Sequence, residues 1–161
     1  MDQKSNSFNL DLFRTTYRGP TVRVKLAVME DAAQYLPTAR FKSSAQVGEY
    51  FSPLQEEPRE ILIALHLDNK HHAISIEEVS KGILDSTLFD PKTILQSTIL
   101  ANAASLIVIH NHPSGDPAPS PQDIQVTKNL KTLMDMLPIR LLDHVIIGRN
   151  RYFSLADAGY L

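Results

Sequence analysis

The pattern of apolar and polar residues along the chain predicts a series of strands and helices. Residues 60–67 are almost continuously apolar, residues 72–79 alternate between apolar and polar, and residues 68–70 form a polar turn between them. Alternation with a period of two is typical of a strand, and the short turn predicts a hairpin. Three further short segments are predicted as strands: 105–109, 139–147 and 152–155.

Three segments carry the signals of a helix start. Ser43 and Ser44 can cap a short helix that runs to about Phe51. A capping Asp90 followed by a proline predicts a second helix, which extends to about residue 103. The third helix begins at a proline with Ser120 as its cap, and one apolar stripe runs along it: Val126, Leu130, Leu133, Met134 and Leu137.

These elements divide the chain into an N-terminal segment and a compact unit. Residues 1–57 are expected to form an arm, with a short strand at 22–28 and a short helix, that is part of the core or packs on it. Pro53 and Pro58 mark a break, and the compact unit is predicted to cover residues 58–161. Because strands and helices alternate there, we expect an α/β or α+β architecture with helices packed on a sheet.

Composition and charge narrow the classes of function. The 161 residues are 43% hydrophobic and 21% charged, close to the globular average, so a real core is expected. The balance of 16 basic against 18 acidic residues favours neither nucleic acid nor an anionic membrane as a partner. The absence of cysteine excludes disulfides and thiolate metal ligands. With no apolar run near the ~20 residues that span a bilayer and no signal-peptide layout, we expect a cytoplasmic protein.

The stretch IVIHNHPSGDPAPSPQD, residues 107–123, carries the candidate chemistry. His110 and His112 are two residues apart at the end of a predicted strand, where residues i and i+2 lie on the same face. Prolines and a glycine then turn the chain. Asp123 falls at the third position of the following helix, in a Ser-x-x-Asp capping arrangement that Ser120 begins. The helix dipole favours a negative charge at that position.

Two neutral imidazoles and one carboxylate form a suitable ligand set for zinc and leave a fourth position for water. Zinc lowers the pKa of such a water to about 7, which makes the water a usable nucleophile. A general base is also needed, and Glu60, at the start of a predicted strand, is a candidate. The sequence therefore predicts a hydrolytic zinc site that consists of His110, His112 and Asp123, with Glu60 as a candidate base.

Each of these residues also has a structural interpretation. Asp116 and Asp123 are typical of a turn and a helix cap, Glu60 is typical of a solvated strand end, and a lone His-x-His pair often binds nothing. Asp116 is an alternative ligand to Asp123, although only four residues separate it from His112. The combination of His-x-His, a seven-residue loop and Ser-x-x-Asp is what favours a site, because an apolar strand has no packing reason to end in two histidines.

The remaining histidines are interpreted more simply. His71 and His72 follow a predicted turn and are expected to be exposed turn residues, and His66 is expected to be a hydrogen-bonded core or rim histidine. Asp143 and His144 leave two alternatives open. They could include a partner that orients a zinc ligand, or they could be a buried structural pair.

The chain resembles the JAMM motif of the JAB/MPN metalloproteases in four features taken together: His110-x-His112, a seven-residue loop, Ser120-x-x-Asp123 and an upstream Glu60. More narrowly, HNHPSGDPAPSPQD, followed by LLDHVIIG at 141–148, is similar to the RadC-like branch of that family. The likeness extends from about residue 58 to residue 155.

This resemblance implies a zinc-dependent peptidase. It implies zinc held by His110, His112 and Asp123, Glu60 as the base that activates water, and Ser120 as a donor that stabilises the oxyanion of the tetrahedral intermediate. It also implies the JAB/MPN fold, a three-layer α-β-α sandwich with a mixed central sheet that resembles the fold of cytidine deaminases. The peptide or isopeptide bond of a peptide or protein substrate would be the bond cleaved.

The chain departs from the family pattern in two respects. Longer RadC-like proteins have an N-terminal region that resembles helix-hairpin-helix DNA-binding modules, whereas only about 57 residues precede the core here, without a basic cluster. Direct nucleic-acid binding and the family's historical DNA-repair name are therefore not supported. The insertions with which JAMM deubiquitinases grip ubiquitin also have no room here, so a ubiquitin substrate is not implied.

Three functions remain as hypotheses. The first is the JAMM-type zinc hydrolase, which an intact set of five polar residues favours. The second is a non-catalytic MPN-type interaction module or a DNA-repair-associated accessory protein. The third is another amidohydrolase, such as a nucleobase deaminase, although the H-x-E and P-C-x-x-C signature of those enzymes is absent. The sequence names no substrate and no oligomeric state, so a homo-oligomer also stays open.

Overall fold

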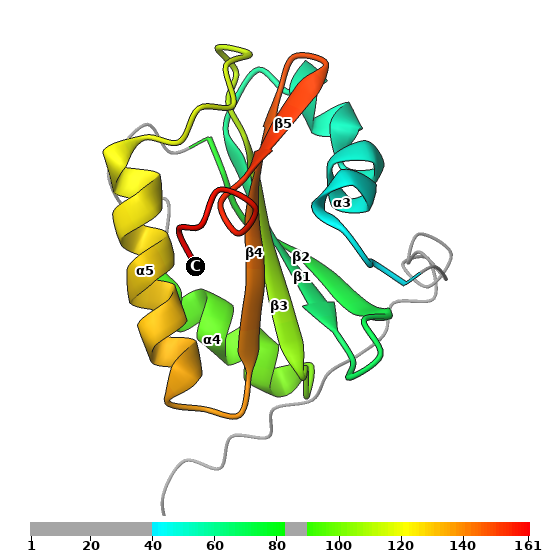
Figure 1. Ribbon diagram of the computed structural model, residues 1–161, viewed down its shortest axis with the longest axis vertical. Helices are drawn as coiled ribbons and strands as arrows, with labels where there is room; N and C mark the ends of the chain where they lie inside the picture. The colour runs from blue at the N-terminus through cyan, green and yellow to red at the C-terminus, as the bar shows by residue number, and fades with distance from the viewer. Residues whose placement is uncertain (1–39, 83–89) are drawn as a thin grey trace, which may run out of the picture.

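The computed structural model describes residues 40–82 and 90–161 of the chain. The strand predicted at 22–28 lies outside the described residues. Five strands and three α-helices follow one another in the described part, with one 3-10 helix, in this order: α3 (Ser44–Tyr50), η1 (Ser52–Glu56), β1 (Ile61–Leu67), β2 (Ala73–Lys81), α4 (Pro91–Leu100), β3 (Ser105–Asn111), α5 (Pro121–Asp135), β4 (Arg140–Gly148) and β5 (Arg151–Ser154) (Figure 1). Every strand and helix predicted in this part of the chain is present.

The strands form one mixed sheet in the order β2-β1-β3-β4-β5. β1 and β2 form the predicted antiparallel hairpin, and β1 is also antiparallel to β3. β3 and β4 are parallel, because the connection between them crosses over through α5. In the register of β1 and β3, Leu62 lies opposite His110, so the start of β1 lies beside the end of β3 that carries the histidines.

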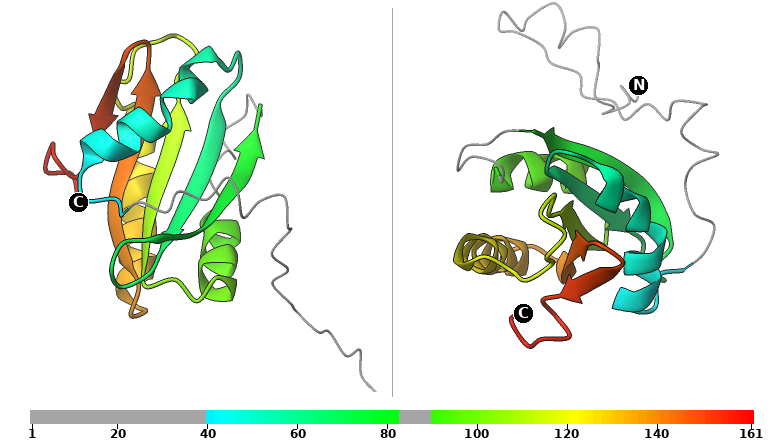
Figure 2. Two further views of the ribbon diagram at one scale, coloured as in Figure 1. Left: turned by 90° about the vertical axis from the view of Figure 1, so that its right-hand side faces the viewer. Right: turned by 90° about the horizontal axis from the view of Figure 1, so that it is seen from above.

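Helices cover both faces of the sheet, as the three-layer prediction requires. On one face, Phe41, Val47 and Phe51 pack with inward-facing residues of β1, β3 and β4. On the other face, Ile94 of α4 joins Leu130 and Met134 of α5 in a second apolar cluster. Figure 2 shows α3 on one side of the sheet and α4 and α5 on the other. Coverage on both sides explains why β1 and β3, buried at every residue, have nearly continuous apolar sequences.

Side chains cap the helices where the sequence predicts. Asp90 accepts a hydrogen bond from the backbone N–H of Lys92 at the start of α4, and Ser120 accepts from the N–H of Asp123 at the start of α5. α4 ends at Leu100, about three residues before the predicted end. Asn102 has a φ of 52°, and this left-handed conformation ends the helix.

The loop after β3 crosses the end of β4 at very short range. A Cβ on Gly148 would lie 2.6 Å from the carbonyl oxygen of Gly115 and 2.6 Å from Cδ of Pro117, so only glycine fits there. The N–H of Arg149 donates to the carbonyl of Gly115 over 2.9 Å. The loop that leads from the histidines to α5 is thus attached to the turn between β4 and β5.

In residues 40–82 and 90–161, none of the helices combines the length and the apolar character that crossing a bilayer requires.

Candidate metal centre

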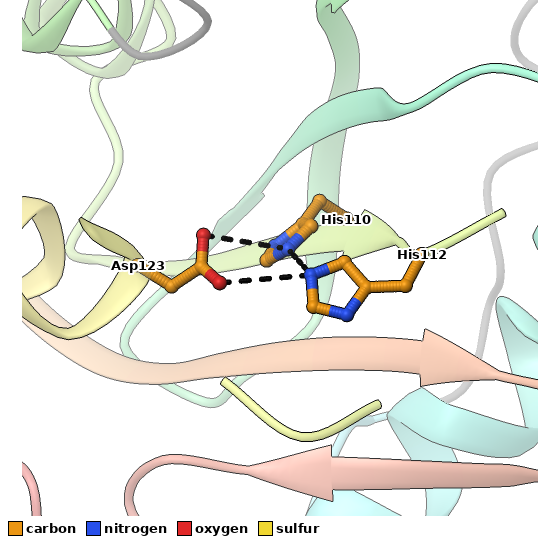
Figure 3. Close-up of side chains that lie close together, drawn as sticks. All are labelled: His110, His112 and Asp123. Carbon is orange, nitrogen blue, oxygen red and sulfur yellow. Dashed lines mark hydrogen bonds and ion pairs between the residues drawn. The ribbon is translucent and has the colours of Figure 1, made fainter. Parts of the chain in front are cut away.

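Three predicted ligands converge at the end of β3 and the first turn of α5. Nε2 of His110 lies 2.9 Å from Nε2 of His112. The two carboxylate oxygens of Asp123 lie 3.6 Å from these nitrogens, Oδ1 from His110 and Oδ2 from His112. Figure 3 shows the two rings and the carboxylate pointing toward one another. Within the described part of the chain, this is the one group of three or more histidine, aspartate or glutamate side chains that could hold a metal ion.

The spacing of these atoms suits a small tetrahedral cation. Zinc bound at about 2.0–2.1 Å in tetrahedral geometry places its ligand atoms about 3.3 Å apart. The separations of 2.9–3.6 Å among the three groups lie close to that value. The donors are two imidazoles and one carboxylate, which zinc accepts, and three protein ligands leave a coordination position open. The residues present therefore fit a zinc ion.

Strand geometry explains the position of the histidines. His110 is part of β3, and His112 follows its last residue while still donating its N–H to the carbonyl of Ile147 on β4, over 2.9 Å. Alternate residues of an extended chain share a face, so both rings lie on one side, as the sequence predicts. His110 is buried and His112 is partly exposed, with 15% of its side chain accessible, so the site is open toward solvent at His112.

A capping box fixes the carboxylate. Ser120 donates to Oδ2 of Asp123 through its N–H, over 2.8 Å, and through its hydroxyl, over 2.7 Å. Asp123 in turn donates its N–H to the Ser120 hydroxyl over 3.1 Å. The one proton of this hydroxyl therefore points toward the carboxylate of Asp123. For Ser120 to stabilise an oxyanion, as the resemblance implies, the hydroxyl would have to rotate toward the substrate.

The electrostatics of the group favour a cation between its members. Burial lowers the pKa of His110 to about 4, so this ring is neutral at neutral pH. The carboxylate of Asp123 raises the pKa of His112, and burial of that ring only partly opposes the effect. Burial would raise the pKa of Asp123, but contacts with His112 and Ser120 and the nearby His110 hold it well below its usual range. The raised pKa of His112 favours a proton on this ring in the metal-free protein, and a metal ion that binds the ring would displace that proton.

Asp116 contacts a predicted ligand through its backbone and lies outside the convergent group. Its backbone carbonyl lies 2.7 Å from Nδ1 of His112. Its carboxylate accepts from the N–H of Ala118 over 3.2 Å and pairs with Arg151 over 3.1 Å, and it is absent from the convergent group. The turn interpretation of this residue is the one that the structure supports.

Glu60 lies immediately before β1, partly exposed, and its negative charge contributes to the raised pKa of His112. The segment that carries it is attached to β3 by the buried Asn111. Oδ1 of Asn111 accepts from the N–H of Ile61 over 2.8 Å, and its Nδ2 donates to the carbonyl of Arg59 over 3.1 Å. Sequence reasoning missed Asn111, although its place between two predicted ligands was a signal.

The open question about Asp143 and His144 has a divided answer. Nε2 of His144 lies 2.7 Å from Nδ1 of His110, so His144 contacts a predicted ligand. Burial lowers the pKa of His144 well below its ordinary value. Asp143 instead accepts from the hydroxyl of Ser154 over 2.6 Å and from the N–H of Ala156 over 3.0 Å. It holds the end of β5, and burial raises its pKa.

The other histidines lie away from this group. His66 is 1% exposed, as expected of a core residue, and its ring contacts the hydroxyls of Ser75 at 2.8 Å and Ser97 at 3.4 Å. His71 lies in the turn after β1 with a φ of 64°, and His72 pairs with Asp68 over 3.1 Å. Both are partly exposed turn residues.

Comparison with known proteins gives one consistent family. The RadC-like JAB domain matches residues 41–160. A UPF0758 protein of Xanthomonas euvesicatoria is 43% identical over 150 residues, which cover 89% of this chain and 67% of that protein. A UPF0758 protein of Methanococcoides burtonii is 39% identical over 150 residues, which cover 89% of this chain and 66% of that protein. A UPF0758 protein of Xylella fastidiosa is 37% identical over 142 residues, with 88% and 63% covered.

Proposed function

The chain belongs to the RadC-like JAB domain family, and on that premise we propose that it is a zinc-dependent hydrolase of JAMM type that cleaves a peptide or isopeptide bond. The observation that carries the proposal is the convergence of His110, His112 and Asp123. Their ligand atoms lie within 4.8 Å of one another although the residues come from a strand, a loop and a helix. A module that only binds other proteins has no need of three such groups with an open coordination position.

The residues of the chain supply positions and protons. His110 and His112 present Nε2 atoms, and Asp123 presents a carboxylate held by the capping box. When bound, zinc supplies Lewis-acid chemistry that polarises a substrate carbonyl and activates water at neutral pH. Glu60, close enough to His112 to influence its pKa, accepts the proton of the attacking water and returns it to the leaving amine.

Metal content tests the binding half of the proposal. We expect about one zinc per chain in the purified protein by mass spectrometry. His112→Ala and Asp123→Ala lose the zinc, whereas Glu60→Gln retains it because Glu60 is not a ligand. Asp135→Ala, which removes an exposed carboxylate at the end of the same helix, is the matched control and keeps full zinc. A stoichiometric zinc content in His112→Ala would overturn the assignment.

Turnover tests the catalytic half. A fluorogenic peptide library, supplemented with isopeptide-linked substrates, is incubated with the zinc-loaded protein and with Glu60→Gln. We expect cleavage by the wild type and a loss of at least 100-fold in Glu60→Gln, in line with the usual contribution of a general base. Glu56→Gln alters an exposed glutamate of η1 and leaves the rate unchanged. Zinc binding without cleavage of any such substrate would favour the interaction module.

A further inference from the structure

A line of buried hydrogen bonds extends from the candidate metal centre into the space between the sheet and α5. Nδ1 of His110 lies 2.7 Å from Nε2 of His144. Nδ1 of His144 lies 2.6 Å from Oγ1 of Thr127, and this oxygen lies 2.6 Å from the backbone carbonyl of Asp123. His144 and Thr127 are each 1% exposed. The line therefore starts at one predicted ligand and ends at the backbone of another.

Proton counting fixes the direction of the bonds around Thr127. A hydroxyl has one proton, and a carbonyl oxygen can only accept. The contact between Oγ1 of Thr127 and the carbonyl of Asp123 therefore uses the hydroxyl proton. Oγ1 must then accept from Nδ1 of His144, since a second short contact without a proton would be repulsive. His144 consequently carries a proton on Nδ1.

The same counting carries through His144 to His110. A neutral His144, which its complete burial favours, has a bare Nε2 when Nδ1 is protonated. That bare nitrogen lies 2.7 Å from Nδ1 of His110, so Nδ1 of His110 must supply the proton between them. Nε2 of His110 is then left with its lone pair, and it is this atom that faces His112 and Asp123.

We infer that Thr127 and His144 are positioning residues that hold His110 in its Nδ1–H tautomer, so that its Nε2 lone pair faces the cation site. This inference rests on the proposed function and deepens it, because a fixed tautomer serves a ligand of that site. The ring of His112 is oriented through a different partner, since the carbonyl of Asp116 accepts from its Nδ1. Both rings therefore present Nε2, each fixed by a separate acceptor.

The tautomers can be read directly from the protein without metal. Long-range ¹H–¹⁵N correlation spectra of the histidine-labelled protein at pH 8 distinguish protonated from bare ring nitrogens. The six histidines are assigned with single histidine variants. We expect His110 and His144 to be protonated on Nδ1 and bare on Nε2. A His144 that is protonated on Nε2 and bare on Nδ1 would overturn the inference.

Variants of Thr127 test whether the tautomers and the zinc affinity depend on its hydroxyl. Thr127→Val removes the hydroxyl at nearly constant volume, so we expect mixed tautomers at His110 and His144. Because Thr127 acts through His144, we expect the zinc dissociation constant to rise about 10-fold, the low end of the effect of losing an outer hydrogen-bond partner. Thr127→Ser restores both. Thr132→Val is the matched control. Its hydroxyl makes the same bond to the carbonyl four residues earlier in α5, that of Lys128, but lies exposed.

The two hypotheses fail in different ways. If the wild-type protein has the expected tautomers but does not bind zinc, the proposed function is wrong and the positioning role of Thr127 and His144 stands. If Thr127→Val binds zinc with wild-type affinity and its tautomers are unchanged, the positioning role is wrong and the proposed function stands. Stability of each variant in urea is measured alongside, so that loss of zinc by an unfolded protein is recognised.

Discussion

At the scale of single residues, alternate positions at the end of β3 serve different purposes. His110 and His112 face the candidate metal centre, while Asn111 between them faces the opposite side and bonds the chain at the start of β1. Asn111 is fully buried. Its side chain bonds Arg59 and Ile61, which adjoin Glu60, and also donates to the carbonyl of Glu57 over 3.4 Å. One strand thus places the ligands and also holds the chain that carries the proposed base.

Replacement of Asn111 tests this connection. Asn111→Ala leaves the buried N–H of Ile61 and a carbonyl unpaired, which costs about 2–4 kcal/mol in the free energy of unfolding, measured in urea. Because the ligands do not depend on this amide, we expect zinc content to stay at the wild-type level while kcat falls more than KM changes. Asn129→Ala removes an exposed amide from α5 and changes stability by less than about 0.5 kcal/mol. An equal loss of free energy of unfolding in the two variants would contradict the role of Asn111 in holding the chain around Glu60.

At the scale of elements, the start of α5 has two functions at once. Ser120 satisfies the N–H of Asp123, which a helix start needs, and it also bonds the carboxylate that faces the histidines. The loop before it packs closely on Gly148 at the end of β4, and the carbonyl of Gly115 in this loop accepts from the N–H of Arg149. These contacts fix where α5 begins relative to the sheet. Helix capping and ligand placement therefore depend on the same few atoms.

Substitutions at two serine caps distinguish helix capping from placement of the Asp123 carboxylate. Ser120→Ala and Ser43→Ala each remove an N-cap, and we expect each to lower the free energy of unfolding by about 0.5–2 kcal/mol. Ser43 caps α3, on the other face of the sheet, so its loss leaves zinc affinity unchanged. Ser120→Ala also frees the carboxylate of Asp123, and we expect weaker zinc binding by calorimetry. If the two variants bind zinc equally well, Ser120 acts as a cap alone.

At the scale of the whole molecule, the three layers bury histidines as well as apolar side chains. Burial lowers the pKa of His66 from 6.5 to about 4, and this ring lies on β1 beside the hydroxyls of Ser75 and Ser97. The folded protein keeps His66 neutral, whereas the unfolded chain takes up a proton below about pH 6.5. The contribution of His66 to the free energy of unfolding is therefore fully present above its pKa in the unfolded chain, and it is lost as the pH falls toward 4.

Acidification from pH 7 to pH 5 gives the measurable consequence. We expect the metal-free wild type to lose about 1–2 kcal/mol more of its free energy of unfolding than His66→Gln over this range. Glutamine has no charge to gain in the unfolded state, and it can still bond a neighbouring serine. Urea melts in EDTA at the two pH values provide the comparison. Parallel pH dependences of the two proteins would show that His66 is not protected from protonation.

The sequence alone determined the elements and the ligand types. Strand period, the caps at Asp90 and Ser120, and the His-x-His spacing are local properties. They predicted the five strands and three α-helices of the described part, and they indicated two histidines and a following aspartate as ligands. They placed the end of α4 about three residues late, because helical spacing continues past Leu100, although asparagine at position 102 is a residue type that adopts the left-handed conformation after a helix. They also could not decide between Asp116 and Asp123 without a resemblance to a known family.

Only the tertiary structure decided which distant residues serve the site. His144 comes from β4, whose parallel pairing with β3 brings it to His110, and Thr127 comes from α5, which packs on the sheet and brings it to His144. Asn111 reaches the chain before β1 because β1 pairs with β3. Hydrogen bonds between elements depend on register and on the distance between layers, which the packing of the whole chain sets and which no local pattern of residues encodes.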